Sequence, residues 1–256
     1  MKIALASMLI LLGCCRDLAC AQAAEVLTAW TYYAAPPFLT DARSNAGLDR
    51  DLVAYLNRKL AGKYEVRLMF VPRARLGSML DTGAKGMVLF APSVIFGGPA
   101  GGKYLWTSAL FDDRQDLLSR ASAPFEYDGP ASLHGVRFGA MLGHTYPALA
   151  EDMDSGRIYA HRNNNEGALL GMLLMQRLDV ITLADSSVRY LVKNDASIAG
   201  KIHVSKQNLG SYARHLMFQE GMARERDDIE DVVARMDSDP AWLAILRTYG
   251  LTHARR

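Results

Sequence analysis

Short apolar runs alternate with amphipathic stretches along most of this chain. The apolar runs are rich in β-branched and aromatic residues and end at turn-forming residues, which is typical of buried strands. We expect strands at residues 26–31, 65–71, 87–91, 115–120, 136–141, 180–183 and 202–204. The amphipathic stretches repeat apolar residues at helical spacing. They predict helices at residues 47–60, 76–80, 146–155, 167–178, 186–193 and 226–236, and a last helix that begins at Pro240.

The first and last of these helices have the clearest signals. Leu48, Leu52 and Leu56 recur every four residues and give the first helix one apolar stripe. Asp239 followed by Pro240 is a strong start signal, because Asp accepts hydrogen bonds at an N-cap and Pro suits the first helical position. Strands that alternate with helices favour an α/β fold with mostly parallel sheets.

Two segments of flexible composition interrupt this alternation. Residues 121–130 are rich in Pro, Gly and Ser and separate two α/β runs, so the pattern alone predicts two lobes. Residues 97–102 read Gly-Gly-Pro-Ala-Gly-Gly. A glycine-rich loop can hold phosphate, but no Lys-Ser or Lys-Thr pair follows this one to open a helix. We therefore expect a surface turn there.

The N-terminus has the pattern of an export signal. Lys2 precedes an apolar run over residues 3–15, and small residues with an A-x-A signature follow at 18–23. The run is shorter than the ~20 apolar residues that a membrane-spanning helix needs. We predict a signal peptide over residues 1–23 and a periplasmic location. Two alternatives stay open: an uncleaved membrane anchor, and a lipoprotein whose lipid is attached to Cys14.

Charge and cysteine content exclude several classes of function. All three cysteines, Cys14, Cys15 and Cys20, precede the predicted cleavage site, so the mature chain has no thiol for catalysis or metal binding. Without residues 1–23 the chain has 27 Lys and Arg against 26 Asp and Glu. This near balance does not suggest a nucleic-acid partner. The histidines have no metal-ligand spacing, so we predict no metal site and no cofactor.

Several segments, taken in order, resemble the bacterial solute-binding protein family 3, the amino-acid-binding type of periplasmic binding proteins. The segments are Pro36-Pro37-Phe38, Gly47 to Leu52, Leu133 to Thr145, Arg177 to Asp185 and Trp242 to Gly250. The resemblance implies a type 2 periplasmic-binding fold. Each lobe would hold a mixed, mostly parallel sheet flanked by helices, and two hinge strands would cross between the lobes. Lobe 1 would comprise residues 24–117 and 207–256, and lobe 2 residues 118–206.

The resemblance further implies a monomeric binding protein, not an enzyme. It would hold a small polar solute, amino-acid-like or another small organic ion, between its lobes and deliver it to an inner-membrane ABC permease. Two alternatives stay open. One is a periplasmic lyase of the same fold, similar to cyclohexadienyl dehydratase, and the other is a ligand-sensing or accessory module.

Candidate ligand-binding residues follow the ends of several predicted strands, which is where open α/β sheets bind their ligands. From the pattern and the resemblance together we expect ligand contacts from Tyr33, Phe38, Arg73, Phe90, Ser93, His144, Thr145 and Asp185. Tyr33 and Phe38 could stack on a ligand, whereas Trp30 is better explained by core packing. The turn before the predicted helix at 146–155 offers backbone N–H groups and the Thr145 hydroxyl to an anion.

Local structural roles are the alternatives for three of these residues. The hydroxyls of Ser93 and Thr145 could cap the turn or helix that follows each of them. In the resemblance Asp185 pairs with a ligand ammonium group. The family's spacing would place this acid one residue earlier, where this chain has Ala184. Asp185 could therefore instead cap the next helix.

One departure from the family concerns the ligand carboxylate. Amino-acid binders of this family place an Arg before the segment that corresponds to Trp106-Thr107-Ser108, and it binds the carboxylate in a bidentate way. Here Ala100 stands nearest that position. Lys103, Arg73 and Arg75 are the cations left to replace it, and Lys is not equivalent to Arg in a bidentate role.

Overall fold

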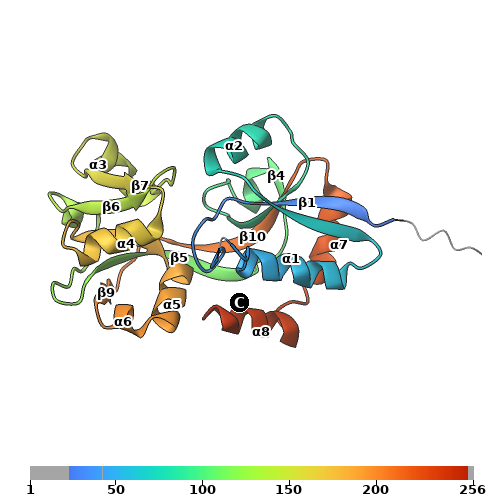
Figure 1. Ribbon diagram of the computed structural model, residues 1–256. Coiled ribbons are helices and arrows are strands. Elements are labelled where there is room, and N and C mark those ends of the chain that lie inside the picture. Colours follow the sequence, from blue (N-terminus) through green and yellow to red (C-terminus); the bar gives the residue numbers. More distant parts are fainter. Residues whose placement is uncertain (1–22, 42, 253–256) are drawn as a thin grey trace, which may run out of the picture.

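The computed structural model describes residues 23–41 and 43–252. Apart from Ala23, the predicted signal peptide and its cysteines lie outside the described residues. The two lobes of the molecule are joined by two long strands (Figure 1). The strands form one continuous path in the order β2-β1-β3-β10-β5-β8-β6-β7, with β4 paired to β10 and β9 paired to β5.

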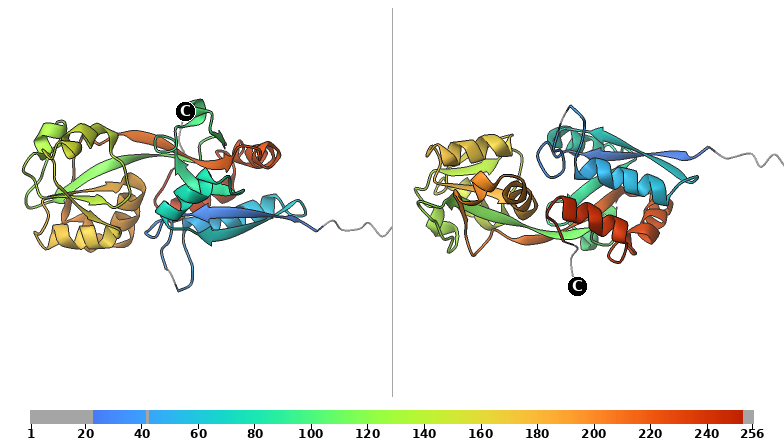
Figure 2. Two further views of the ribbon diagram at one scale, coloured as in Figure 1. Left: turned by 90° about the horizontal axis from the view of Figure 1, so that it is seen from above. Right: turned by 60° about the horizontal axis from the view of Figure 1, so that its bottom comes forward.

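The first lobe is built on three parallel strands, β1 (Glu25–Thr31), β2 (Tyr64–Phe70) and β3 (Met87–Pro92). Helices α1 (Leu48–Lys59) and α2 (Arg73–Asp81) connect them, and α7 (Ala223–Val233) and α8 (Pro240–Thr248) complete the lobe. Figure 2 shows α1 and α8 side by side, where the rings of Tyr55 and Trp242 pack 5.8 Å apart. The leucine stripe of α1 is buried in this core, as its spacing predicts.

The second lobe repeats the plan with shorter strands. Strands β6 (Phe138–Met141), β7 (Ala160–Asn163) and β8 (Val180–Ala184) are parallel, and β9 (Ile202–Val204) pairs with β5. The helices are α3 (Ala150–Asp154), α4 (Glu166–Leu174), α5 (Asp185–Asn194) and α6 (Ala196–Ala199). Short 3-10 turns cover Pro99–Gly101, Pro130–Leu133 and Pro147–Leu149.

The connecting strands are β5 (Phe111–Arg120) and β10 (Ser211–Gln219). Over Phe111–Arg114, β5 pairs antiparallel with the start of β10, and from Gln115 onward it pairs with β8 of the second lobe. Strand β10 continues into the first lobe beside β3 and β4 (Tyr104–Trp106). The mixed, mostly parallel sheets, the flanking helices and the two crossing strands confirm the predicted fold class. The residue boundaries of the lobes stay a prediction.

The structure also corrects several element predictions. The local pattern does not predict strands β4, β7 and β10; β10 ends before the helix expected over residues 226–236 and is one of the two crossing strands that the resemblance implies. Helix α4 ends at Leu174, because Gln176 takes a left-handed conformation with a φ of +61°. The helix expected over residues 146–155 is a 3-10 turn that begins at Pro147, followed by α3. At the last helix, Asp239 accepts a hydrogen bond from Ala241 N, which confirms the predicted N-cap.

Candidate functional site

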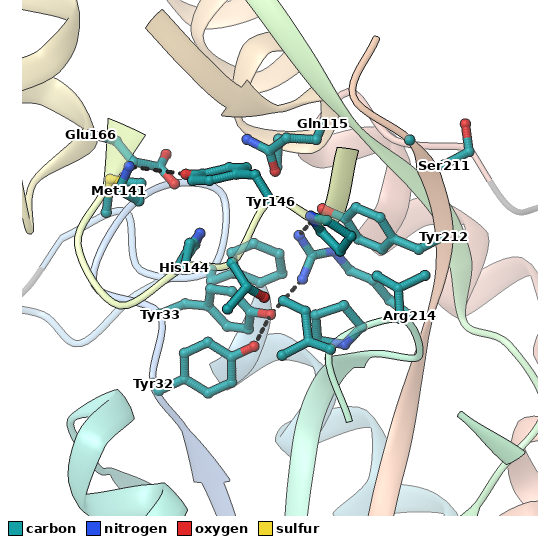
Figure 3. Close-up of a pocket in the computed structure, with 18 residues that line it drawn as sticks. Tyr32, Tyr33, Gln115, Met141, His144, Tyr146, Glu166, Ser211, Tyr212 and Arg214 are labelled. Atoms are coloured by element: carbon teal, nitrogen blue, oxygen red, sulfur yellow. Dashed lines mark hydrogen bonds between the residues drawn. The ribbon is translucent and has the colours of Figure 1, made fainter. Parts of the chain in front are cut away.

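A cavity of about 120 Å³ lies between the lobes, beside both connecting strands. It is formed where β1, β3, β6 and β8 end and where β10 begins. The first lobe contributes Tyr32, Tyr33, Phe38, Pro92, Val94 and Ile95, and the second lobe Met141, His144, Thr145, Tyr146, Pro147, Glu166 and Ala184. The connecting strands and their approach add Gln115, Gly210, Ser211, Tyr212 and Arg214 (Figure 3). A solute in this cavity would contact both lobes.

Arg214 is the central cation of the cavity, although its side chain is only 3% exposed. Its Nε donates to Asp113 Oδ2 at 2.5 Å, and its Nη1 donates to the Tyr33 hydroxyl at 2.6 Å and to the Phe90 carbonyl at 3.1 Å. Its Nη2 donates to the Tyr212 hydroxyl at 3.3 Å. A guanidinium group has five N–H donors. The described residues provide these four acceptors, which leaves one N–H of Nη2 without an acceptor among them.

The cation is held in place by the connecting strands themselves. Asp113, on β5, is 3% exposed and also accepts hydrogen bonds from the Ser186 backbone N–H and hydroxyl at the start of α5. A buried carboxylate of this kind is tolerated because its charge is paired and its oxygens are hydrogen-bonded. One acid therefore joins Arg214 on β10 to a helix of the second lobe.

Aromatic rings form the wall of the cavity around Arg214. The guanidinium carbon lies 5.0 Å from the ring centroid of Tyr33, 4.8 Å from that of Phe38 and 5.3 Å from that of Tyr212. Tyr33 and Phe38 stack on each other at 4.2 Å, and Tyr32 donates to or accepts from the Tyr33 hydroxyl at 2.7 Å. Burial raises the pKa of Tyr33, so this ring keeps its proton and its face stays available to a cation.

The second lobe presents two ionisable side chains to the cavity, His144 and Glu166. Burial lowers the pKa of His144 to about 4, with the positive charges of Arg214 and Arg73 as further causes, so the ring is neutral at physiological pH. Burial raises the pKa of Glu166 to about 7, although the nearby Ser187 hydroxyl and the charge of Arg214 act in the other direction. In Figure 3 both side chains lie across the cavity from Arg214.

The structure places four of the expected residues, Tyr33, Phe38, His144 and Thr145, in the lining of the cavity. Phe90 is fully buried behind it and takes part through its carbonyl, at a φ of +52° that residues other than glycine seldom adopt. None of these placements tests ligand binding, which stays a prediction for every one of them.

The other expected residues lie beside the cavity and do not line it. The Ser93 hydroxyl donates to the Ala213 carbonyl at 3.4 Å. The guanidinium of Arg73 packs on Tyr32 and Phe96, with its carbon 5.5 Å and 4.6 Å from the ring centroids. Asp185 is bound by Arg189 at 2.6 Å and by Arg114 at 3.4 Å. It makes no side-chain cap at the start of α5.

Sequence reasoning did not identify Arg214, Glu166, Asp113 or Tyr212. Lys103, considered as the replacement cation, is exposed and pairs with Asp81 at 3.0 Å. The signal for Arg214 is an Arg-His pair, Arg214-His215, inside an otherwise apolar run that ends in Leu-Met-Phe. A polar pair within a buried strand needs hydrogen-bond partners, and such residues are often functional.

Two kinds of feature are absent from the described part of the chain. No helix in residues 23–41 or 43–252 is long and apolar enough to cross a membrane. Over the same residues, no group of three or more His, Cys, Asp or Glu side chains is arranged to hold a metal ion.

Comparisons by sequence find no matching family model and no matching curated protein. Comparisons by structure find many solved structures with a similar fold. A mutant of the arginine-binding protein ArgBP from T. maritima superposes with a TM-score of 0.70 at 17% identity, over 88% of this chain and 94% of that chain. The GluR0 ligand-binding core from Nostoc punctiforme, in complex with L-glutamate, gives a TM-score of 0.71 at 13% identity, over 87% and 98% of the two chains.

A third neighbour is the substrate-binding protein of an amino acid ABC transporter, with a TM-score of 0.66 at 14% identity over 88% of this chain and 98% of that chain. All three neighbours are binding proteins or ligand-binding domains. At these identities the likeness establishes architecture: this chain has the two-lobed α/β fold of the amino-acid-binding periplasmic proteins.

Proposed function

We propose that this protein binds a small zwitterionic solute, such as an amino acid, in the cavity between its lobes. The observation that carries the proposal is the position of Arg214, which lines the cavity with one N–H donor still available. Glu166 lies on the opposite wall. A carboxylate would bind at Arg214 through a charge-assisted hydrogen bond, and an ammonium group would pair with Glu166.

The contact at Arg214 differs from a bidentate grip on a carboxylate. Four of its five donors are already used, and Asp113 compensates its charge at 2.5 Å. The cavity therefore offers a ligand carboxylate one N–H of Arg214 together with neutral donors such as His144. It does not offer the uncompensated positive charge of a free guanidinium group. Structural neighbours that bind arginine, glutamine and glutamate support an amino-acid-like ligand for this fold.

The cellular role that we propose is capture in the periplasm and delivery to an ABC transporter. A solute that contacts both lobes favours the closed arrangement by its differential affinity, and a transporter can recognise that arrangement. The export signal predicted over residues 1–23 and the transporter-associated neighbour support this role.

The experiment that tests the proposal is a thermal-shift screen over amino acids, polyamines, organic acids and sugars, followed by calorimetry. A true ligand at 100 times its Kd adds about 2.7 kcal/mol to the free energy of unfolding. The shift should shrink in Glu166→Gln and persist in Asp154→Asn, an exposed acid outside the cavity. No response to any of the four classes of compound would contradict the proposal.

A lyase is the second candidate function, and one observation favours it. Glu166 faces the cavity with a pKa of about 7, which suits a general acid or base near neutral pH. Purified protein incubated with prephenate or arogenate would then form product. If it binds a solute and leaves these compounds unchanged, the binding function stands alone.

A further inference from the structure

The guanidinium group of Arg214 is surrounded by the features that a binding site would use for a guanidinium ligand. A carboxylate, a carbonyl and two phenol hydroxyls accept from its edges. Three aromatic rings lie within 5.3 Å of its central carbon. Planar donors matched to fixed acceptors, with aromatic faces alongside, are the contacts that distinguish guanidinium from an ammonium ion.

A side chain that offers a single donor to a ligand does not need this many contacts to hold it in position. Asp113 alone would fix and compensate the cation. The chain also turns the carbonyl of Phe90 toward Nη1, at a φ of +52°, within the strand β3. Tyr33 donates to the same carbonyl at 3.1 Å, so carbonyl, phenol and guanidinium form one connected cluster.

This guanidinium site is continuous with the ligand cavity. Tyr33, Phe38 and Tyr212 contact the guanidinium and also line the cavity, as does Arg214 itself. If the Arg214 side chain were absent, the cavity would extend past these rings to Asp113, whose carboxylate is buried. The side chain therefore fills a branch of the cavity that ends at an acid.

We propose that Arg214 is a tethered internal ligand, which fills a guanidinium-binding branch of the cleft and thereby excludes solutes with a guanidinium group. The consequence of this inference for ligand selectivity rests on the proposed function. With the branch filled and Asp113 neutralised, the solute must be small enough for the remaining cavity of about 120 Å³. Truncation of Arg214 converts the same cleft into a receptor for guanidinium compounds.

The test is chemical rescue of Arg214→Gly. Removal of the side chain leaves the Asp113 carboxylate buried without its cation, which is strongly destabilising. Ethylguanidinium chloride at millimolar concentration, far below the denaturing range, should raise the melting temperature of the variant in a saturable way. Ethylammonium chloride at equal ionic strength should bind the variant at least about tenfold more weakly, because it lacks the planar fork of donors. The wild-type protein should respond to neither.

A double variant shows whether Asp113 carries the selectivity. Asp113→Asn with Arg214→Gly has no uncompensated buried charge and should lose most of the preference for ethylguanidinium. If Arg214→Gly is unfolded without additives, the same titration is followed by refolding yield, with ethylammonium as the matched control. Failure of ethylguanidinium to stabilise or refold the variant would overturn the proposal. Equal rescue by the two cations, or equal binding of ethylguanidinium to the wild type, would do the same.

The rescue does not use the natural solute, so its outcome is separable from that of the proposed function. A screen without any hit leaves the rescue experiment valid. Conversely, a confirmed amino-acid ligand together with absent rescue would retain Arg214 as a ligand contact and remove its role as an internal ligand.

Discussion

Asp49 is a buried carboxyl group on α1 with only one of its oxygens satisfied. The side chain of Thr31 donates to Oδ2 at 2.5 Å, whereas Oδ1 is buried and has no partner among the described residues. Burial raises the pKa of Asp49 to about 8, against the hydrogen bond from Thr31, which lowers it. The residue therefore carries its proton at neutral pH and gives the fold a pH dependence opposite to that of a salt-bridged acid.

We predict that Asp49→Asn flattens the pH dependence of stability. From about pH 4 to about pH 8 the folded state holds the Asp49 proton and the unfolded state does not. The stabilisation from this group is thus complete below the ordinary pKa and is lost as the pH rises through about 8. Urea unfolding on both sides of this window should show the wild type losing stability relative to Asp49→Asn as the pH rises. A parallel slope in both proteins would contradict the assignment, and Asp154→Asn serves as the exposed control.

Glu166 makes a related prediction for ligand binding. Its pKa of about 7 must fall when a ligand ammonium group pairs with the carboxylate. Affinity for a zwitterionic solute should therefore rise with pH up to about 7 and then level off, with proton release on binding. Calorimetry in two buffers of different ionisation enthalpy measures that release, and Glu166→Gln should abolish it. Unchanged proton release in Glu166→Gln would assign the proton to another group.

At the residue scale, the sequence pointed to two of the aromatic residues that line the cavity, Tyr33 and Phe38, and did not identify Arg214. Tyr33 and Phe38 follow strand β1, and the local sequence predicts where that strand ends. Arg214 was missed because its partner Asp113 lies 101 residues away in the sequence, and only the pairing of β5 with β10 brings the two together. No local pattern records a contact of that kind.

At the scale of elements, the loop between β1 and α1 holds one wall of the cavity. The first backbone N–H groups of α1 donate into this loop, from Leu48 to the Pro37 carbonyl at 2.9 Å and from Asp49 to the Phe38 carbonyl at 3.3 Å. Gly47 immediately precedes these two residues with a φ of +150°, and a Cβ there would meet the Phe38 oxygen at 2.0 Å. The helix start therefore fixes the position of Phe38 against Arg214.

We predict that Gly47→Ala destabilises the protein by about 1–3 kcal/mol, because the added carbon must displace backbone. It should also weaken solute binding, since Phe38 moves with the loop. Gly171→Ala is the matched control, because its Cβ would meet nothing within 4 Å inside α4. That change should stabilise the protein by about 0.5–1 kcal/mol and leave binding unchanged. Urea unfolding and calorimetry measure both effects, and equal stability of the two variants would refute the argument.

Elements with a clean apolar period were predictable, and the exceptions have a common physical cause. Strand β10 carries Arg214 and His215 at buried positions, so its hydrophobic pattern does not predict a buried strand. Strand β7 (Ala160–Asn163) is an edge strand with exposed polar residues, and β4 has three residues. Partners elsewhere in the chain stabilise these strands, so their own sequences carry little signal.

At the scale of the whole molecule, the lobes touch directly beside the cavity. The Ser187 hydroxyl, in the first turn of α5, donates to the Pro36 carbonyl in the first lobe at 2.9 Å. The preceding residue, Ser186, is bonded to Asp113 on the connecting strand β5. The start of α5 thus contacts both the opposite lobe and the strand that joins the lobes. A change at this position should therefore alter the equilibrium between open and closed arrangements of the lobes.

We predict that Ser187→Ala shifts the ligand-free protein toward a more open arrangement. A hydrogen bond of this kind contributes about 0.5–1.5 kcal/mol, and here that contribution exists only while the lobes are in contact. Because part of the solute's binding energy must then be spent on closing the lobes, affinity should fall about two- to tenfold while the stability of each lobe is kept. Small-angle X-ray scattering should show a larger radius of gyration without solute and the wild-type value at saturation. Ser122→Ala, at an exposed site in the connector, is the control. If Ser187→Ala keeps both the wild-type radius and the wild-type affinity, the bond to Pro36 contributes nothing to closure, and the contacts of Lys193 with the Arg247 and Thr248 carbonyls remain to hold α5 against the first lobe.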